Sequence, residues 1–338
     1  MRVSSEKQSL VIAPQWIGDA VMTEPLMRRL QRRGERLTVG ALPWVAPVYR
    51  AMPQVAQVLE LPFAHGGLQW QARRALAKTL RGRFDAAYVC PNSLKSALLP
   101  WWAGIEKRIG YHGEMRWGVL TQRLNNPAKG ARPPMVAFYS ALSGEAGVES
   151  DTPVLHVQPE LVDAAVKALG LERGGYYVFA PGAEFGPAKR WPPLRFAELA
   201  LQLTLPVVLL GSGKEAGLCR EITDAVHAHR AGQCLDFSGR TSLDQALAII
   251  AAAKAMVSND SGLMHVAAAF SVPQVAVFGS SSPLHTPPLS REARVLWLKN
   301  DPAYQPALDC APCFARECPL GHTRCLNDIK PADVARFL

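Results

Sequence analysis

The stretch Ala255–Ala269 reads AMVSNDSGLMHVAAA and decides the fold, because it joins a strand to a helix through a short polar turn. The apolar residues up to Ser258 fit a buried strand, and the small residues after Gly262 fit a helix. Asp260 and Ser261 therefore stand at a helix N-terminus, where backbone N–H groups and the helix dipole favour an anion. The stretch predicts one β-α step of a parallel sheet with a phosphate at its turn.

The same turn has a purely structural alternative. Asp260 and Ser261 are residue types that cap helices, and His265 would then pack in the interior. We favour the anion site because Gly262 lets the backbone approach a ligand closely. His265 would lie one helical turn further on, near that ligand.

Short apolar or β-branched runs alternate with helical patterns along the rest of the chain. The predicted strands are Leu10–Ala13, Leu37–Ala41, Val55–Leu61, Asp85–Cys90, Arg108–Tyr111, Tyr176–Ala180, Val207–Gly211, Leu235–Phe237, Ala255–Ser258, Val275–Phe278 and Val295–Leu298. The predicted helices are Ala20–Arg33, Gln69–Leu80, 133–149, Leu194–Leu203, Glu215–His229, Leu243–Ala253 (with Ser242 as N-cap), Gly262–Phe270 and Pro331–Leu338.

Repeated β-α-β units require parallel sheets covered by helices on both faces, so the fold class is α/β. Because the alternation breaks near 150–175, we expect two doubly wound, Rossmann-like domains facing each other across a cleft. The expected ranges are 1–168, 169–330 and a short C-terminal helix at 331–338. Ligands in such sheets bind beyond the carboxyl ends of the strands, so the chemistry is expected in the loops that follow strands.

Composition limits the classes of protein to which the chain could belong. Of 338 residues, 49% are hydrophobic and 19% are charged, which is enough apolar material for packed cores. The apolar run Ser96–Ile105 is too short to span a bilayer, and the first residues, MRVSSEKQSL, lack the apolar region of a secretory signal. We therefore expect a cytoplasmic protein whose seven cysteines are reduced.

The net charge of +9 is concentrated in the first half of the chain. Residues 1–168 hold 21 Lys and Arg against 13 Asp and Glu, whereas residues 169–338 hold 16 against 15. The first half is therefore expected to favour an anionic partner, which could be a nucleic acid, an acidic membrane surface or a phosphorylated substrate. A basic surface without a partner is the alternative.

The loop after the first strand, PQWIGDAVMTEP at 14–25, contains one candidate catalytic group. Asp19 falls at the start of a helix, where a carboxylate is either an N-cap or, at a cleft, a proton acceptor. Because Pro25 lies within the helical pattern, the helix is expected either to kink there or to become regular only near Pro25.

Two loops of the second half carry further candidates. In PGAEFGPAKRWP at 181–192, the cations of Lys189 and Arg190 would suit a diphosphate, and a solvated charge pair is the alternative. Glu215 follows Gly211-Ser212-Gly213 and could accept the hydroxyls of a ribose. The full G-x-G-x-x-G fingerprint is absent because residue 216 is alanine, which argues against a Rossmann oxidoreductase.

The sequence holds no D-x-D pair, which would be the usual clamp for Mg²⁺ or Mn²⁺ on a diphosphate. We therefore expect no metal and no cofactor in the reaction, with the leaving group stabilised by Lys189 and a helix N-terminus. Cys310, Cys313, Cys318 and Cys325, with His322 among them, could form a structural zinc site. Reduced cysteines packed in an irregular segment are the interpretation we favour.

Taken together, WIGDAVMTEP, PGAEFGPAKRWP, SNDSGLMHVAAA and FGSSSPLHTPP resemble, in this order, the motifs of glycosyltransferase family 9, the heptosyltransferases of lipopolysaccharide core synthesis. The resemblance spans nearly the whole chain. The tail CAPCFARECPLGHTRCLNDI is most similar to the members that add the second heptose; members acting on a neighbouring acceptor are the alternative.

The resemblance implies the GT-B architecture, with the acceptor on the first domain and ADP-heptose on the second. It implies that Asp19 is the general base, that Lys189 binds phosphate, and that Asp260, Ser261, Gly262 and His265 form the donor loop. Glu215 corresponds by position in a variable loop. In PNSLKSALLP at 91–100, Asn92 and Lys95 resemble an acceptor-side loop.

The implied reaction is an inverting transfer of L-glycero-D-manno-heptose from ADP-heptose to an anionic heptosyl-Kdo-lipid A acceptor at the cytoplasmic face of the inner membrane. The basic first half would then contact the acceptor and the membrane surface. One rival is a GT-B sugar-nucleotide epimerase or hydrolase, which needs no acceptor. The other is a basic, zinc-containing nucleic-acid binder, against which the near-neutral charge around the cysteines argues.

Overall fold

The computed structural model describes residues 6–63, 67–128, 133–145 and 151–338, and the chain divides into two compact units, Met1–His156 and Val157–Leu338. The division falls earlier than the expected boundary at 168/169. The reason is that helix α7 (Pro159–Ala168) buries Val162 and Val166 and packs on helix α10 (Leu243–Ala251) of the second unit. The C-terminal residues 331–338 also belong to the second unit.

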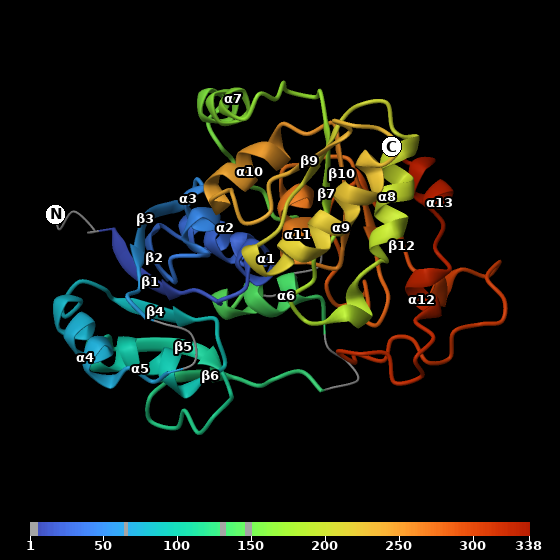
Figure 1. The fold of residues 1–338 in the computed structure, drawn as a ribbon. Helices are drawn as coiled ribbons and strands as arrows, with labels where there is room; N and C mark the ends of the chain where they lie inside the picture. Colours follow the sequence, from blue (N-terminus) through green and yellow to red (C-terminus); the bar gives the residue numbers. More distant parts are fainter. Residues whose placement is uncertain (1–5, 64–66, 129–132, 146–150) are drawn as a thin grey trace. The chain divides into compact units, whose positions relative to one another are not determined.

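The first unit is built on a six-stranded sheet whose paired strands are all parallel, in the order β3-β2-β1-β4-β5-β6 (Figure 1). The strands are β1 (Lys7–Ile12), β2 (Glu35–Ala41), β3 (Val55–Glu60), β4 (Ala86–Val89), β5 (Lys107–Tyr111) and β6 (Gln122–Leu124). The helices are α1 (Ile17–Met22), α2 (Glu24–Arg32), α3 (Ala46–Arg50), α4 (Trp70–Thr79), α5 (Leu94–Trp102) and α6 (Met135–Ser140).

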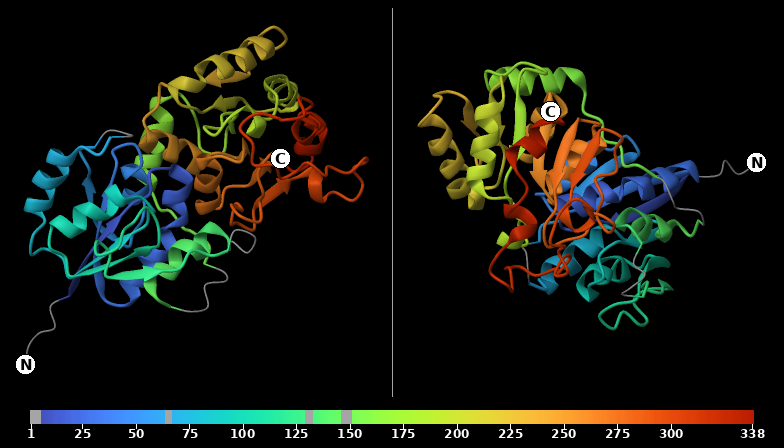
Figure 2. Two further views of the ribbon diagram at one scale, coloured as in Figure 1. Left: turned by 90° about the horizontal axis from the view of Figure 1, so that it is seen from below. Right: turned by 90° about the vertical axis from the view of Figure 1, so that its right-hand side faces the viewer.

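Helices cover both faces of this sheet, as expected for buried parallel strands (Figures 1 and 2). On one face, Leu10 and Val89 share a core with the apolar residues of α4 and α5. Because side chains alternate along a strand, Tyr88 and Cys90 lie on the opposite face, where α1, α2, α3 and α6 pack together.

The second unit repeats the plan with the strand order β12-β11-β10-β7-β8-β9, again with parallel pairing. Its strands are β7 (Tyr177–Ala180), β8 (Val207–Leu209), β9 (Cys234–Asp236), β10 (Ala255–Asn259), β11 (Gln274–Val277) and β12 (Ala293–Leu296). Besides α7 and α10, its helices are α8 (Pro193–Gln202), α9 (Ala216–His227), α11 (Gly262–Ala269), α12 (Arg324–Asn327) and α13 (Pro331–Ala335).

The two faces of this second sheet are covered by different helices. Phe196 of α8, Ile222 of α9 and Val334 of α13 share one core with Phe179 of β7. On the other face, Met264 of α11 packs against Ala276 and Phe278, and α11 also contacts α10. The predicted Ser242 cap is confirmed, because its Oγ accepts a hydrogen bond from the Gln245 N–H at 3.2 Å.

Two helices predicted from the first half differ in the structure. The expected helix Ala20–Arg33 divides at Thr23 into α1 and α2, and Pro25, which has no N–H to donate, lies in the first turn of α2. The expected helix 133–149 is shorter: α6 is followed by a 3₁₀ turn that ends at Ser143. Residues 146–150 of that prediction lie outside the described residues.

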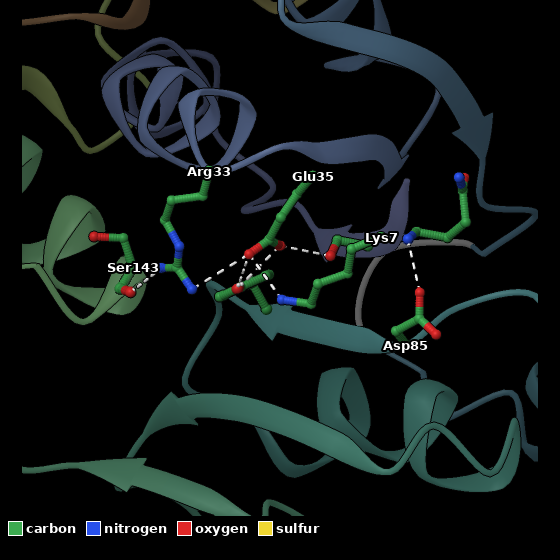
Figure 3. Close-up of polar contacts among 8 residues, drawn as sticks. Lys7, Arg33, Glu35, Asp85 and Ser143 are labelled. Carbon is green, nitrogen blue, oxygen red and sulfur yellow. Dashed lines mark hydrogen bonds and ion pairs between the residues drawn. The ribbon is translucent and has the colours of Figure 1, made fainter. Parts of the chain in front are cut away.

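A buried carboxylate ties the strands of the first unit together at the N-terminal end of β2 (Figure 3). Glu35 accepts hydrogen bonds from Lys7 at 2.8 Å, Ser9 at 2.6 Å and Tyr88 at 3.0 Å, and it forms an ion pair with Arg33 at 3.4 Å. Burial raises the pKa of Glu35, but these hydrogen bonds outweigh burial, so the net pKa is lowered. The cluster is at the edge of the sheet opposite the post-strand loops and therefore has a structural role.

Within the described residues, no helix has the length and apolar character needed to cross a membrane.

Candidate functional site

In each unit the strand order reverses between the first and fourth strands of that unit, which are β1 and β4, and β7 and β10. Loops that leave such a pair diverge to opposite sides and leave room for a ligand at the carboxyl edge. The loops after β1 and β4 contain Asp19 and Asn92, and those after β7 and β10 contain Lys189 and Asp260. Asp19 and Asn92 therefore lie at the carboxyl edge of the first sheet, and Lys189 and Asp260 lie at the carboxyl edge of the second.

Asp19 is the third residue of α1, and Trp16 occupies the N-cap position. The interpretation of Asp19 as an N-cap was therefore wrong. The Tyr139 hydroxyl, from α6, donates a hydrogen bond to the Asp19 Oδ1 atom at 2.9 Å. The sequence analysis missed Tyr139, because nothing in the local pattern of α6 links it to a residue so distant in the chain.

Three titratable groups close to Asp19, those of Tyr49, Cys90 and Tyr139, are neutral at physiological pH. Burial raises the pKa values of Tyr49, Cys90 and Tyr139 well above their ordinary range, and the charge of Asp19 raises each of them further. All three keep their protons at pH 7. A carboxylate that is held in place by a phenolic hydroxyl among neutral neighbours is suited to accepting a proton from a substrate hydroxyl.

The predicted acceptor residues Asn92 and Lys95 lie in the loop after β4 and the first turn of α5. The Asn92 Oδ1 atom accepts a hydrogen bond from Arg116 at 3.2 Å, and Arg116 also donates to the carbonyl of Pro91 at 2.8 Å and to that of Tyr111. The buried Arg116 guanidinium therefore ties the loops after β4 and β5 together. Burial lowers the pKa of Arg116 to about 10, so it stays charged at pH 7.

In the second unit, the structure brings Lys189 and Asp260 into direct contact. The Lys189 Nζ atom lies 2.5 Å from Asp260 Oδ2, and the Thr286 hydroxyl donates to Asp260 Oδ1 at 3.4 Å. The Asn259 side chain fixes this arrangement, since it accepts a bond from the Trp191 N–H at 2.9 Å and donates to the Pro181 carbonyl at 2.6 Å. The end of β10 thereby holds both ends of the loop that carries Lys189.

Among the described residues of the second unit, four serine hydroxyls are buried without a hydrogen-bond partner. Ser258 is one of them and lies within β10; the other three, Ser261, Ser280 and Ser281, lie in the loops that follow β10 and β11. Ser261 occupies the N-cap position of α11, yet its side chain forms no capping bond, and Gly262 is the first residue of the helix. The Ser280 N–H donates to the carbonyl of Ala188 at 3.3 Å, next to Lys189. Hydroxyl donors beside an ammonium group suit phosphate oxygens, which favours the anion interpretation over simple capping.

Ser280, Ser281 and Thr286 were not predicted as individual candidates, although the FGSSSPLHTPP motif contains all three. The available signal was their position after the predicted strand Val275–Phe278. Since the carboxyl ends of parallel strands lie at one edge, this loop had to come close to the loops that carry Lys189 and Asp260.

His265 is buried near the ion pair and is neutral. Burial lowers its pKa to about 4; Asp260 partly offsets this effect, and Lys189 adds to it. At pH 7 the imidazole therefore adds no positive charge for a phosphate, although a role for its ring nitrogens in donor binding remains a prediction.

Glu215 has structural contacts in this structure. Its Oε2 atom accepts hydrogen bonds from the N–H and the hydroxyl of Ser212, at 2.7 and 3.0 Å. A Cβ atom on Gly182 would lie 1.5 Å from the other carboxylate oxygen, so any larger residue at 182 would force the Glu215 carboxylate to move. Binding of a ribose by Glu215 remains a prediction.

The cysteine-rich tail supports the loop that carries Lys189. The Arg316 side chain donates a hydrogen bond to the Phe185 carbonyl at 2.8 Å, and the Arg316 carbonyl accepts one from the Ala188 N–H at 3.0 Å. The Phe314 N–H donates to the carbonyl of Ser280 at 2.7 Å. The cysteines are free thiols, and in the described part of the chain no three His, Cys, Asp or Glu side chains are grouped as a metal site requires. Cys325 packs against the core of the second unit.

Comparisons with known proteins agree with this geometry. The sequence profile of glycosyltransferase family 9 (heptosyltransferase) matches residues 73–323. The chain is 45% identical to the lipopolysaccharide heptosyltransferase 2 of Escherichia coli (strain K12), over 86% of this chain and 87% of that protein. It is 39% identical to the lipooligosaccharide heptosyltransferase 2 of Haemophilus influenzae, over 86% and 88%.

The fold has been seen before in a solved structure, that of the E. coli ADP-heptose lps heptosyltransferase II. It matches with a TM-score of 0.84 at 39% identity, covering 97% of this chain and 96% of that one. This match confirms the predicted α/β, GT-B class with its two parallel sheets. The chain therefore belongs to glycosyltransferase family 9, the heptosyltransferases.

Proposed function

We propose that the chain transfers L-glycero-D-manno-heptose from ADP-heptose to the inner-core heptose of lipopolysaccharide, with inversion at the anomeric carbon. The observation that carries this proposal is the extensive identity with proteins named lipopolysaccharide heptosyltransferase 2. The substrates follow from those names and from that of the solved E. coli protein. The acceptor would be a heptosyl-Kdo-lipid A, reached at the cytoplasmic face of the inner membrane.

In the first unit, Asp19 is the proposed catalytic base. The acceptor hydroxyl attacks the anomeric carbon and gives its proton to the Asp19 carboxylate. A carboxylate is a weak base towards an alcohol, so the proton moves late, when the attacking oxygen has gained positive charge. Tyr139 supports this step because its hydroxyl holds one carboxylate oxygen at 2.9 Å.

In the second unit, Lys189 and the start of α11 are the proposed site for the diphosphate. As the bond from the anomeric carbon to the β-phosphate oxygen breaks, ADP leaves with the electron pair and gains negative charge. An ammonium group has three N–H donors, and Asp260 accepts from one of them at 2.5 Å. Lys189, the N–H groups at Ser261 and Gly262, and the buried serine hydroxyls would stabilise the departing oxygen.

The test is an assay of ADP release from ADP-heptose by the purified protein, with and without heptosyl-Kdo-lipid A. We expect ADP release to require the acceptor, and mass spectrometry to show the acceptor heavier by one heptose. Rapid turnover of ADP-heptose without the acceptor would instead identify an epimerase or hydrolase and would refute the proposal.

A further inference from the structure

Three tryptophans form one partly exposed aromatic cluster across α4 and α5. The rings of Trp70 and Trp102 are 4.5 Å apart in an edge-to-face contact, and those of Trp101 and Trp102 are 6.3 Å apart. Trp70 is 47% exposed and Trp101 is 43% exposed, and Leu68 beside them is 45% exposed. Figures 1 and 2 show α4 and α5 side by side in this unit. A grouped apolar surface of this kind marks an interaction site more often than isolated exposed residues do.

Of the three tryptophans, Trp102 packs against the core beneath the helices, whereas Trp70 and Trp101 are not among the residues of that core. The inner side of α5 buries Ala97, Leu98 and Leu99, and the inner side of α4 buries Ala77. The tryptophans Trp70 and Trp101 stand instead where their rings meet solvent, at an energetic cost unless a partner covers them.

The surface around the tryptophans is strongly basic. The segment from Gly67 to Phe84 contains five Lys and Arg and no Asp or Glu. Arg74 and Lys78 are exposed, and the Arg74 guanidinium lies 5.9 Å from the centre of the Trp70 ring. Of the five basic residues in this segment, Arg73 is buried, and the exposed ones are Arg74, Lys78, Arg81 and Arg83. The partner of this surface is therefore anionic.

We propose that the α4–α5 surface, made of Leu68, Trp70, Trp101, Trp102, Arg74 and Lys78, docks on the headgroup region of an anionic bilayer. Tryptophan rings favour the boundary between headgroups and acyl chains, and Lys and Arg are attracted to anionic headgroups. A nucleic acid fits less well, because Trp70 and Trp102 meet edge to face and Arg74 lies beside the Trp70 ring, which leaves no stacking platform of parallel rings.

This inference rests on the proposed function for its purpose, since docking would bring the enzyme to an acceptor whose lipid A is embedded in the bilayer. None of the six surface residues is a candidate acceptor residue or the base Asp19, although Lys95 lies at the start of α5 and Trp101 and Trp102 lie at its end. Docking and chemistry can therefore be measured separately.

The test is sedimentation of the full-length protein with vesicles of phosphatidylethanolamine and phosphatidylglycerol, compared with vesicles of neutral phosphatidylcholine. We expect binding only to the anionic vesicles, and we expect it to weaken as salt rises. The double variants W70A/W101A and R74Q/K78Q should each reduce the partition coefficient about tenfold or more.

Matched controls come from exposed residues of the second unit. L161A removes an exposed apolar side chain, and K167Q/R220Q removes the same two positive charges as R74Q/K78Q. Both controls should bind vesicles like the unchanged protein. Thermal unfolding of every variant checks that the fold is intact.

Wild-type partitioning by the folded W70A/W101A and R74Q/K78Q variants would overturn the inference, as would equal binding to neutral vesicles. DNA binding by the same variants is measured in parallel. If the variants lose DNA binding but keep vesicle binding, the surface belongs to nucleic acid and the membrane inference is overturned.

Turnover on a de-acylated, soluble acceptor separates this inference from the proposed function. The surface variants should keep their turnover on this soluble acceptor, because they change docking and not the chemistry. If the unchanged protein shows no turnover on any acceptor, the proposed function is refuted, and the result says nothing about docking.

Discussion

At the scale of single residues, the sequence suggested charged groups, whose roles remain predictions, but not all of the side chains that contact them in the structure. Asp19 and Lys189 were predictable because each follows a recognisable strand in a recognisable motif. Tyr139 was not, because its contact with Asp19 joins distant parts of the chain, whereas Thr286 lies in a loop whose place after a predicted strand was an available signal. Local patterns carry no information about such pairings until the sheet order is known.

The hydrogen bond from Tyr139 to Asp19 predicts a specific effect on the pH dependence of turnover. The Tyr139→Phe variant loses a donor that favours the ionised carboxylate, so the acidic limb of the kcat profile should move to higher pH. At pH 7, kcat should fall about tenfold, because the carboxylate is less well oriented. The KM for ADP-heptose should stay the same. A kcat profile that superimposes on that of the unchanged protein would contradict this role.

Lys189 should contribute mainly to binding of the diphosphate. We expect Lys189→Met to weaken ADP binding by about tenfold to a hundredfold, because a charge-assisted hydrogen bond to phosphate is lost. Isothermal titration calorimetry with ADP measures the effect. Lys214→Met is the matched control, since Lys214 pairs with Glu184 and is largely exposed. If Lys189→Met and Lys214→Met bind ADP equally well, the phosphate role of Lys189 fails.

At the scale of elements, strands were predicted well where burial on both faces makes them continuous apolar runs. The core strands β1, β4, β7 and β10 were all found to within a few residues. The edge strand β6 was missed, because Gln122–Leu124 is short and largely exposed and so lacks that signal. The break between α1 and α2 was left open by the sequence, since Pro25 allows either a kink or a new start.

The polar cluster around Glu35 predicts a pH-dependent contribution to stability. Because the folded-state pKa lies below the usual 4.5, the stabilisation is present above that pH and is lost as the pH falls through the folded value. Glu35→Gln should lower the free energy of unfolding by about 1–3 kcal/mol at pH 7, and by less below pH 4.5.

Urea denaturation at a series of pH values checks this expectation. Glu60→Gln is the control, because Glu60 pairs with Arg50 at the surface and should change stability little. A Glu35→Gln effect that is as large in acid as at pH 7 would show that the carboxylate charge is not what stabilises the cluster.

At the scale of the whole molecule, the sequence predicted two units but put their boundary too late. No helix was predicted between 149 and 194, so the residues of α7 fell within the break at 150–175 in which the boundary was placed. Its buried residues Val162 and Val166 pack with the second unit, and only three-dimensional contacts reveal that choice.

Each unit has its own hydrophobic core, so the second unit should fold and bind the donor nucleotide by itself. We expect a fragment comprising 157–338 to bind ADP with an affinity within about tenfold of the full chain, because Lys189, Asp260 and Ser261 all belong to it. Circular dichroism checks folding and calorimetry checks binding. A folded fragment that does not bind ADP would refute the assignment of the donor site to this unit.

The most direct test of the central claim, that Asp19 is the base of a heptosyl transfer, is the single-turnover rate of Asp19→Asn with ADP-heptose and heptosyl-Kdo-lipid A. The amide keeps the shape of the side chain but cannot accept the proton, so the rate should fall about 10²–10⁴-fold while the binding of ADP stays unchanged. The control is Asp163→Asn, an exposed carboxylate paired with Arg173, which should keep the full rate. If Asp19→Asn transfers heptose as fast as the unchanged protein, Asp19 is not the base.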